Sequence, residues 1–283
     1  MKVLIIYFSG TGNTKVLAQG YKTIFEKRGH EVSILSIEEG TNLPEHDILV
    51  VGGPIYAGNM PDELINWVRK NIKKVTAPKQ AIVYSSSAGL LNANGVKSIG
   101  KKLINKGYTL IDSTTFEMPR NFYIDKYEPT PEALQKQHFE SAVEKLIQSV
   151  NKVNRHKDVA KDETNSNTNF NTKPNANSNT QDNMTTETVG IEIKESVMMI
   201  DFFADLFRMM AKSMGKSFQI NEKCIGCGVC EKNCPKENID FKEKKYYNQC
   251  MLCTRCIHNC PVNAISYKGK TIEQYRVHYT LKI

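Results

Sequence analysis

The first 150 residues alternate short apolar runs with amphipathic segments. Apolar runs typical of strands cover residues 2–8, 31–36, 47–52, 80–85 and 108–117. Segments with helical spacing follow at 13–28, 62–72, 95–105 and 131–150. Strands that alternate with helices favour a parallel sheet, because each parallel connection needs a crossover. The pattern therefore predicts an α/β domain with a doubly wound five-stranded parallel sheet over residues 1–152.

This pattern is lost after the first domain. Residues 153–190 are rich in Asn, Ser and Thr and nearly free of apolar side chains. Such a segment buries too little surface to offset the entropy lost on ordering, so we expect a disordered linker. Apolar positions return at 191–216, where we expect a Met-rich amphipathic helix that packs against a domain or binds a partner or membrane surface.

All eight cysteines lie near the end of the chain, in two copies of one motif. Each copy reads C-x2-C-x2-C-x3-C-P, and the copies are offset by 26 residues. This is the spacing of bacterial ferredoxins with two [4Fe–4S] clusters, in which the fourth cysteine of each motif ligates the other cluster. The expected ligands are Cys224, Cys227, Cys230 and Cys260 for cluster 1 and Cys250, Cys253, Cys256 and Cys234 for cluster 2.

Structural zinc and disulfides are the alternatives for these cysteines. Zinc sites use paired C-x2-C ligands without a third and fourth cysteine in each motif. Disulfide frameworks are typical of short secreted chains, whereas the apolar run at 3–8 is too short for a secretory signal. We expect a cytoplasmic protein with a small α+β cluster-binding domain and tail at 217–283, in which His258 is exposed and not a ligand.

The amount and distribution of charge limit the classes of partner that we expect. The net charge of +8 is scattered, without the dense basic block of a nucleic-acid-binding surface, and no apolar stretch is long enough for a transmembrane segment. We expect neither nucleic acid nor a membrane span. Residues 217–283 hold 11 basic and 6 acidic side chains, which favours a redox partner protein with an acidic docking face. The pattern leaves the oligomeric state open.

A loop rich in glycine and hydroxyl groups separates the first predicted strand from the first predicted helix. Its residues are Ser9, Gly10, Thr11, Gly12, Asn13 and Thr14. Hydroxyls and the N–H groups of a helix N-terminus bind phosphate. The loop lacks the Gly-Lys-Ser/Thr of a Walker motif and the third glycine of a dinucleotide fingerprint. It resembles the FMN phosphate loop of flavodoxins.

Two further loops resemble the flavin-facing loops of flavodoxins. They follow the third and fourth predicted strands and contain Pro54, Ile55, Tyr56, Ala57 and Gly58, and Ser85, Ser86, Ser87, Ala88 and Gly89. The resemblance implies that Tyr56 stacks on the flavin ring and that Gly58 contacts it. The second loop has no stacking aromatic, so we expect a less enclosed flavin. Asn121, after the fifth strand, is the last candidate, at the edge of the ring.

Taken together, the order of these parts resembles the flavodoxin–ferredoxin fusion family of anaerobes, and the tail at 270–279 does too. The resemblance implies an electron-transfer protein that passes electrons between FMN and two [4Fe–4S] clusters and links one- and two-electron partners. The alternative is a flavin-dependent oxidoreductase of the quinone or NAD(P)H reductase type, fed by its own clusters. A redox sensor is a third reading. No catalytic residues are expected, because no acid–base or nucleophile arrangement is present.

Overall fold

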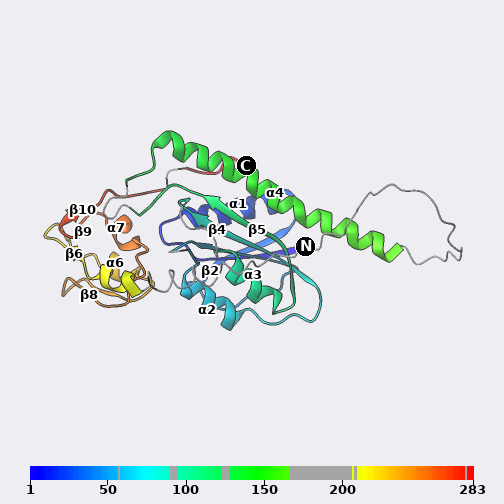
Figure 1. Ribbon diagram of the computed structural model, residues 1–283, viewed down its shortest axis with the longest axis horizontal. Coiled ribbons are helices and arrows are strands. Elements are labelled where there is room, and N and C mark those ends of the chain that lie inside the picture. The colour runs from blue at the N-terminus through cyan, green and yellow to red at the C-terminus, as the bar shows by residue number, and fades with distance from the viewer. Residues whose placement is uncertain (57, 90–94, 123–127, 166–205, 207–208, 278) are drawn as a thin grey trace, which may run out of the picture.

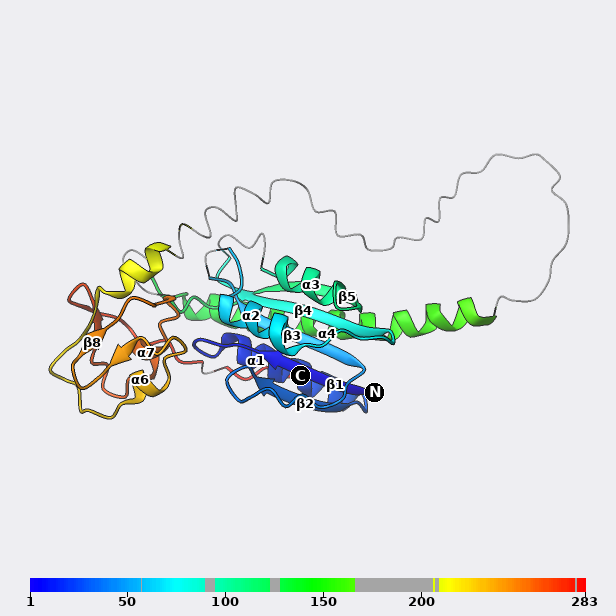
Figure 2. The same ribbon diagram turned by 90° about the horizontal axis from the view of Figure 1, so that it is seen from below.

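The computed structural model describes residues 1–56, 58–89, 95–122, 128–165, 206, 209–277 and 279–283, with only the backbone at 154–165. Figure 1 shows a layered α/β domain and a smaller domain beside one end of its sheet. Seen at right angles in Figure 2, the small domain again lies beyond the ends of the strands. These are the carboxyl ends, where open α/β sheets bind their ligands.

Five parallel strands form the large sheet in the order β2-β1-β3-β4-β5. Their bounds are β1 Lys2–Tyr7, β2 Glu31–Ser36, β3 Ile48–Pro54, β4 Lys79–Ser87 and β5 Tyr108–Glu117. The central strand β3 is buried along its whole length, which explains its unbroken apolar run. This strand order is that of a flavodoxin-like doubly wound sheet, so the predicted fold class is confirmed.

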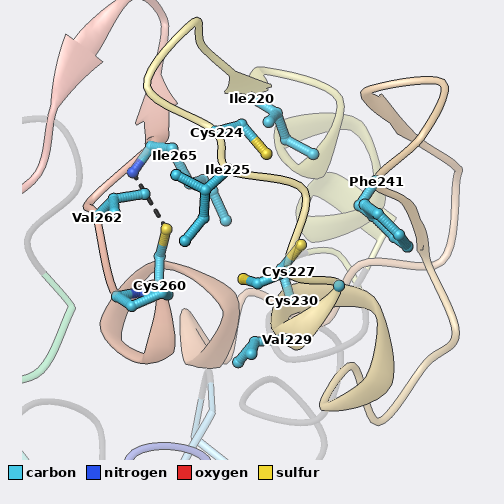
Figure 3. Close-up of a pocket in the computed structure, with 13 residues that line it drawn as sticks. Ile220, Cys224, Ile225, Cys227, Val229, Cys230, Phe241, Cys260, Val262 and Ile265 are labelled. Atoms are coloured by element: carbon cyan, nitrogen blue, oxygen red, sulfur yellow. Dashed lines mark hydrogen bonds between the residues drawn. The ribbon is translucent and has the colours of Figure 1, made fainter.

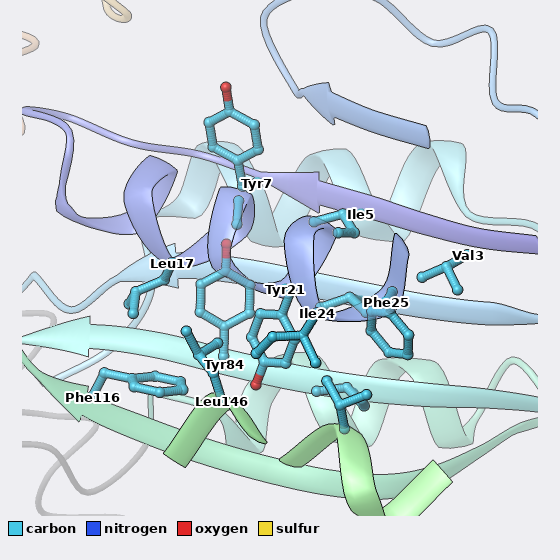
Figure 4. Close-up of a cluster of buried hydrophobic side chains, with 14 of the residues drawn as sticks. Val3, Ile5, Tyr7, Leu17, Tyr21, Ile24, Phe25, Tyr84, Phe116 and Leu146 are labelled. Atoms are coloured by element: carbon cyan, nitrogen blue, oxygen red, sulfur yellow. The ribbon is translucent and has the colours of Figure 1, made fainter. Parts of the chain in front are cut away.

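Helices cover both faces of the sheet. The helices α1 (Asn13–Lys27) and α4 (Glu132–Asn165) pack on one face, and α2 (Asp62–Asn71) and α3 (Lys97–Ile104) on the other. Figure 4 shows the aromatic centre of the first face, where the Tyr21 ring lies against Tyr84 with centroids 5.1 Å apart. Tyr21 also donates a 2.9 Å hydrogen bond to Ser149 Oγ, which ties α1 to α4.

Helix α4 is longer than the sequence pattern predicts. We expected it to end at Val150, with a disordered linker from residue 153, but the helix continues to Asn165. Its last residues are polar and include good helix formers such as Lys and Glu, so they extend a helix that tertiary packing has already nucleated. The rest of the expected linker, from 166 to 190, lies outside the described residues.

The small domain has short antiparallel strands and two short helices. One sheet has the order β10-β9-β6 and the other pairs β7 with β8. Their bounds are β6 Phe218–Ile220, α6 Val229–Lys232, β7 Ile239–Asp240, β8 Lys245–Tyr246, α7 Arg255–Asn259, β9 Ile265–Tyr267 and β10 Lys270–Thr271. The expected α+β architecture is therefore confirmed.

Part of the expected Met-rich helix is described. Residues 209–215 are helical, and Ala211 and Met214 pack against the core of the small domain. Met209 and Met210 are 69% and 51% exposed. The segment 191–205 lies outside the described residues.

The end of the chain returns to the α/β domain. We call residues 272–277 and 279–283 the C-terminal strap. Val277, Leu281 and Ile283 pack against the core that lies between the sheet and helices α1 and α4. Lys27 Nζ donates a 2.6 Å hydrogen bond to the backbone oxygen of Ile283. The strap thus adds a second, non-covalent connection between the domains, independent of the segment that follows α4.

Within the part of the chain that the structure describes, every helix is too short or too polar to cross a lipid bilayer.

Replacing Leu146 with alanine is expected to destabilise the α/β domain by about 2–5 kcal/mol, because the side chain is fully buried on α4 and its loss leaves a cavity. Urea unfolding followed by circular dichroism measures the change. Leu134→Ala is the matched control on the same helix, since Leu134 is 41% exposed and should cost less than about 0.5 kcal/mol. Equal losses in the two variants would contradict the assigned face of α4.

Candidate cofactor sites

The eight cysteines form two separate groups of four. Cys224, Cys227, Cys230 and Cys260 line one cavity, and Figure 3 shows them around it. A second cavity is lined by Cys234, Cys250, Cys253 and Cys256. Each group takes three thiols from one motif and the fourth from the other. We call the groups the first cage and the second cage.

Apolar side chains line both cages, and the second cage is also lined by the polar residues Lys236, Asn238, Thr254 and Arg255. Ile220, Phe241 and Ile265 line the first cage, and Phe218, Ile239 and Met251 line the second. In the described residues, no three His, Cys, Asp or Glu side chains converge on a single metal ion. The eight thiols are free of disulfide bonds.

Backbone amides point at the cysteine sulfurs. Ala264 N–H donates to Cys260 Sγ at 3.2 Å, Leu252 N–H to Cys250 Sγ at 3.3 Å, and Asn238 N–H to Cys234 Sγ at 3.3 Å. Such bonds favour the thiolate and tune the potential of an iron–sulfur cluster. The donor set therefore fits a thiolate-bound cluster.

Burial makes thiolates costly in the second cage. Loss of solvation raises the pKa of Cys250 to about 11 and that of Cys253 to about 12. The pKa of Cys256 is raised well above its usual value, first by burial and then by the Cys253 charge. Four thiolates at this place require compensating cations, and the iron ions of a [4Fe–4S] cluster would supply them.

The loop between β1 and α1 is closed around a serine hydroxyl. Ser9 Oγ accepts hydrogen bonds from the N–H groups of Gly12 at 3.1 Å and Lys15 at 3.3 Å. Gly12 has φ 112°, which a side chain would strain, and a Cβ there would lie 2.8 Å from Val277. The described residues offer no acceptor to the N–H groups of Gly10, Thr11, Asn13 and Thr14. These donors fit the phosphate of FMN.

Side chains of three loops meet at this site. Thr14 Oγ1 lies 2.7 Å from Ser86 Oγ, and Asn121 Nδ2 donates to Thr11 Oγ1. The phosphate loop, the end of β4 and the loop after β5 are thus brought together. Ser85 Oγ instead pairs with Thr115 Oγ1 on β5 at 2.8 Å.

The remaining flavin-loop candidates take several positions. Pro54 ends β3, Ser87 ends β4, and Ile55 packs against the core beneath α2 and α3. Gly58 and Gly89 have φ of 85° and 83°, consistent with tight turns. Ala88 precedes the second of these turns, and Ala57 lies outside the described residues.

Asn13 holds the phosphate loop to two other segments. Its Nδ2 donates to Pro119 O at 2.8 Å, and its Oδ1 accepts from Tyr275 Oη at 2.6 Å. Tyr275 belongs to the C-terminal strap, so a residue beyond the cysteine motifs helps to shape the flavin site. The side chain of Asn13 is already engaged, which leaves its backbone N–H as the group that can bind phosphate.

Tyr56 lies between the phosphate loop and the second cage. A Cβ built on Gly10 would lie 2.3 Å from Tyr56 Oη and 3.5 Å from Cys253 Cβ. Burial, followed by the Cys253 charge, raises the pKa of Tyr56 well above 10. The predicted stacking of Tyr56 on the flavin stays a prediction. What the sequence did not indicate is that Tyr56 lies close to the cluster-binding domain.

Arg255 joins the two domains through all its nitrogen atoms. Nε donates to Gly10 O at 3.0 Å, and Nη2 donates to Ser9 O at 2.6 Å. The guanidinium forms a bidentate pair with Glu38, at 2.6 and 2.9 Å. Its side chain is only 10% exposed. The sequence carried one signal for this role, because the matching position of the first cysteine motif is Val229.

His258 is buried, and the expectation that it is exposed is wrong. It is 4% exposed and sits where helix α7 meets the loop after β5. Tyr275 N–H donates to His258 Nδ1 at 2.9 Å, so Nδ1 is the acceptor and Nε2 carries the proton that Asn121 O accepts at 2.6 Å. Burial lowers the pKa of His258, in agreement with this neutral form. The expectation assumed a solvated loop and could not include the neighbouring domain.

Models of two domain families match the chain. The flavodoxin domain model matches residues 4–116, and the 4Fe-4S dicluster domain model matches residues 223–264. These matches and the two sites define a flavin- and iron–sulfur-binding class of electron-transfer proteins. The chain carries an N-terminal flavodoxin domain and a C-terminal 4Fe-4S dicluster domain, the arrangement of a flavodoxin–ferredoxin fusion.

Solved flavodoxins resemble the first domain. Oxidised flavodoxin 2 from Bacillus cereus is 23% identical, with 54% of this chain and 99% of that chain covered and a TM-score of 0.41. Two-electron reduced flavodoxin from Megasphaera elsdenii is 22% identical, with coverage of 50% and 98% and a TM-score of 0.36. No curated protein matches the chain at a significant level.

Thr14→Ala is expected to weaken FMN binding about tenfold, or ~1.4 kcal/mol, because it removes a hydroxyl from the phosphate loop and leaves Ser86 without its partner. Fluorescence titration of the flavin-depleted protein measures the affinity, and iron content should not change. Thr23→Ala is the control on the same helix, since the Thr23 hydroxyl bonds to Gln19 O. A Thr14→Ala affinity equal to that of the control would rule out the role.

Cys227→Ser and Cys260→Ser are expected to remove the same cluster, although the two residues belong to different motifs. Cys234→Ser, in the first motif, should remove the other one. Each variant is expected to lose about half of its iron and sulfide, which is the loss that one cluster per cage predicts. Electron paramagnetic resonance distinguishes the two remaining signals. If Cys234→Ser gave the same spectrum as Cys227→Ser, the exchange of fourth ligands would be wrong.

Proposed function

We propose that this chain is an electron carrier that holds one FMN and two [4Fe–4S] clusters and links one-electron with two-electron redox partners. The observation that carries the proposal is the junction between the two domains. Arg255, from the loop of the second cage, is bonded to the phosphate-loop carbonyls of Ser9 and Gly10. The cluster-binding domain is thereby held against the loops that fit a flavin.

The two cofactor types differ in the number of electrons that they carry, which gives their proximity a functional role. A bound flavin can hold one or two electrons, while each cluster carries one. The chain contributes the positions of the two sites, apolar walls around the cages and N–H donors at the cysteine sulfurs. A fixed junction keeps the two sites close without an encounter between separate proteins.

The proposal also includes the cellular compartment of the protein and the class of its partner. Eight cysteine ligands have to stay reduced before cluster assembly, which favours the cytoplasm of an anaerobe. Residues 217–283 hold an excess of basic side chains, which favours an acidic partner protein.

Chemical analysis of protein purified without oxygen tests the cofactors. We expect about eight irons, eight sulfides and one FMN per chain, because two [4Fe–4S] clusters require that amount. Inductively coupled plasma spectrometry, sulfide assay and flavin fluorescence provide the three numbers. Zinc in place of iron, or about four irons per chain in fully loaded protein, would overturn the two-cluster assignment.

Steady-state assays separate the carrier from a reductase. With NADH or NADPH as the electron donor and a quinone as the acceptor, we expect no turnover above that of free FMN, whereas the protein should accept electrons from a reduced ferredoxin under the same anaerobic conditions. Saturable turnover with NAD(P)H or a quinone would establish the flavin-dependent oxidoreductase instead.

A further inference from the structure

The two cysteine motifs are copies in sequence but have different surroundings. With the offset of 26 residues, Ile225, Gly228, Val229 and Lys232 of the first motif correspond to Met251, Thr254, Arg255 and His258 of the second. All four residues of the second motif contact the flavodoxin domain. We call the corresponding first-motif residues the outer face.

The second motif binds the flavodoxin domain through three kinds of contact. Met251 packs against the core beneath α2 and α3 of the flavodoxin domain. Thr254 Oγ1 donates to Asn121 O at 3.2 Å, and Arg255 binds the carboxylate of Glu38. Nearby, Lys236 Nζ lies 2.5 Å from Glu63 Oε1. The second motif thus binds a protein surface that offers an apolar patch, backbone carbonyls and the Glu38 carboxylate.

The two cysteine motifs also differ in the backbone conformation of corresponding residues. The first motif has Gly226 and Gly228 at φ 69°, whereas the second has Leu252 and Thr254 at φ 56°. Non-glycine residues are uncommon in this conformation and add strain. The second motif accepts that strain at two positions whose side chains are 4% and 3% exposed. The first motif keeps the open glycine loop.

In the outer face, Ile225 and Lys232 are exposed and Gly228 and Val229 are half-buried. Ile225 is 65% exposed, and the Cys227 ligand of the first cage is exposed as well. In contrast, Cys253 of the second cage lies beneath the phosphate loop, next to Gly10. Electron transfer between proteins needs close approach, and the exposed Cys227 gives a separate protein a route to the first cage.

We propose that the two cages have different partners: the second cage faces the flavin loops within the molecule, and the outer face of the first cage docks a separate, acidic one-electron carrier protein. This inference rests on the proposed function. The occupant is chosen by charge, because the outer face carries the exposed Lys232 and belongs to a segment with 11 basic and 6 acidic side chains.

A stopped-flow experiment with the full-length, cofactor-loaded protein tests the outer face. The probe is a reduced plant-type [2Fe–2S] ferredoxin with an acidic surface, and the second-order rate of cluster reduction is recorded at several salt concentrations. Ile225→Glu is expected to lower this rate about tenfold, because it places a charge in the centre of the docking face. Lys232→Glu is expected to lower the rate severalfold and to flatten its salt dependence.

Two controls make the result specific. Lys270→Glu changes the charge equally on exposed β10, away from the outer face, and should leave the rate unchanged. Arg255→Val gives the second motif the residue of the first. It should accelerate hydrogen exchange at the amides of residues 9–16, because the interdomain bonds to Ser9 and Gly10 are lost.

Iron, sulfide and FMN are counted in every sample before the kinetics. Absence of clusters from the wild-type protein would overturn the proposed function itself. Fully loaded Ile225→Glu and Lys232→Glu proteins with wild-type rates would overturn only this inference, as would an Arg255→Val protein whose hydrogen exchange at residues 9–16 is unchanged. If Ile225→Glu loses its cluster, Lys232→Glu decides, since Lys232 is exposed and outside the cage.

Discussion

A single guanidinium determines how the two halves of this molecule meet. Arg255 donates to two carbonyls of the phosphate loop, to Asn233 O and to both oxygens of Glu38. Arg255 Cζ also lies over the ring of Phe8, 5.3 Å from the ring centroid. A buried guanidinium with fewer partners would cost free energy, so the fully bonded state strongly favours one docking geometry. The positions of both cofactor sites depend on that geometry.

The junction uses loops that each domain needs for its own chemistry. The phosphate loop supplies carbonyl acceptors from Ser9 and Gly10 while its free N–H groups remain available for an anion. In the cluster-binding domain, Arg255 lies between Cys253 and Cys256 in the sequence and lines the second cage with them. No separate docking segment is required there, because opposite faces of the same peptides serve cofactor binding and domain contact.

Sequence reasoning predicted the sheet, the two motifs and the loops that surround the candidate flavin site. Those features depend on local signals: apolar periodicity, cysteine spacing and a glycine-rich turn after a strand. It missed the buried state of His258 and the role of Tyr275, because both depend on contacts with residues more than 100 positions away. The length of α4 was also missed, since its last turns have no apolar face to mark them.

Because of the C-terminal strap, the two domains that the motifs delimit along the sequence are not independent folding units. Val277, Leu281 and Ile283 complete the apolar surface of α1, a helix that begins at residue 13. A fragment that ended near residue 152 would expose this surface, and a fragment of the cluster-binding part alone would carry an unpartnered apolar tail. Contacts that span most of the chain also slow folding, because a long loop has to close before they form. The two halves therefore make poor independent building blocks, although their motifs are clearly separate along the sequence.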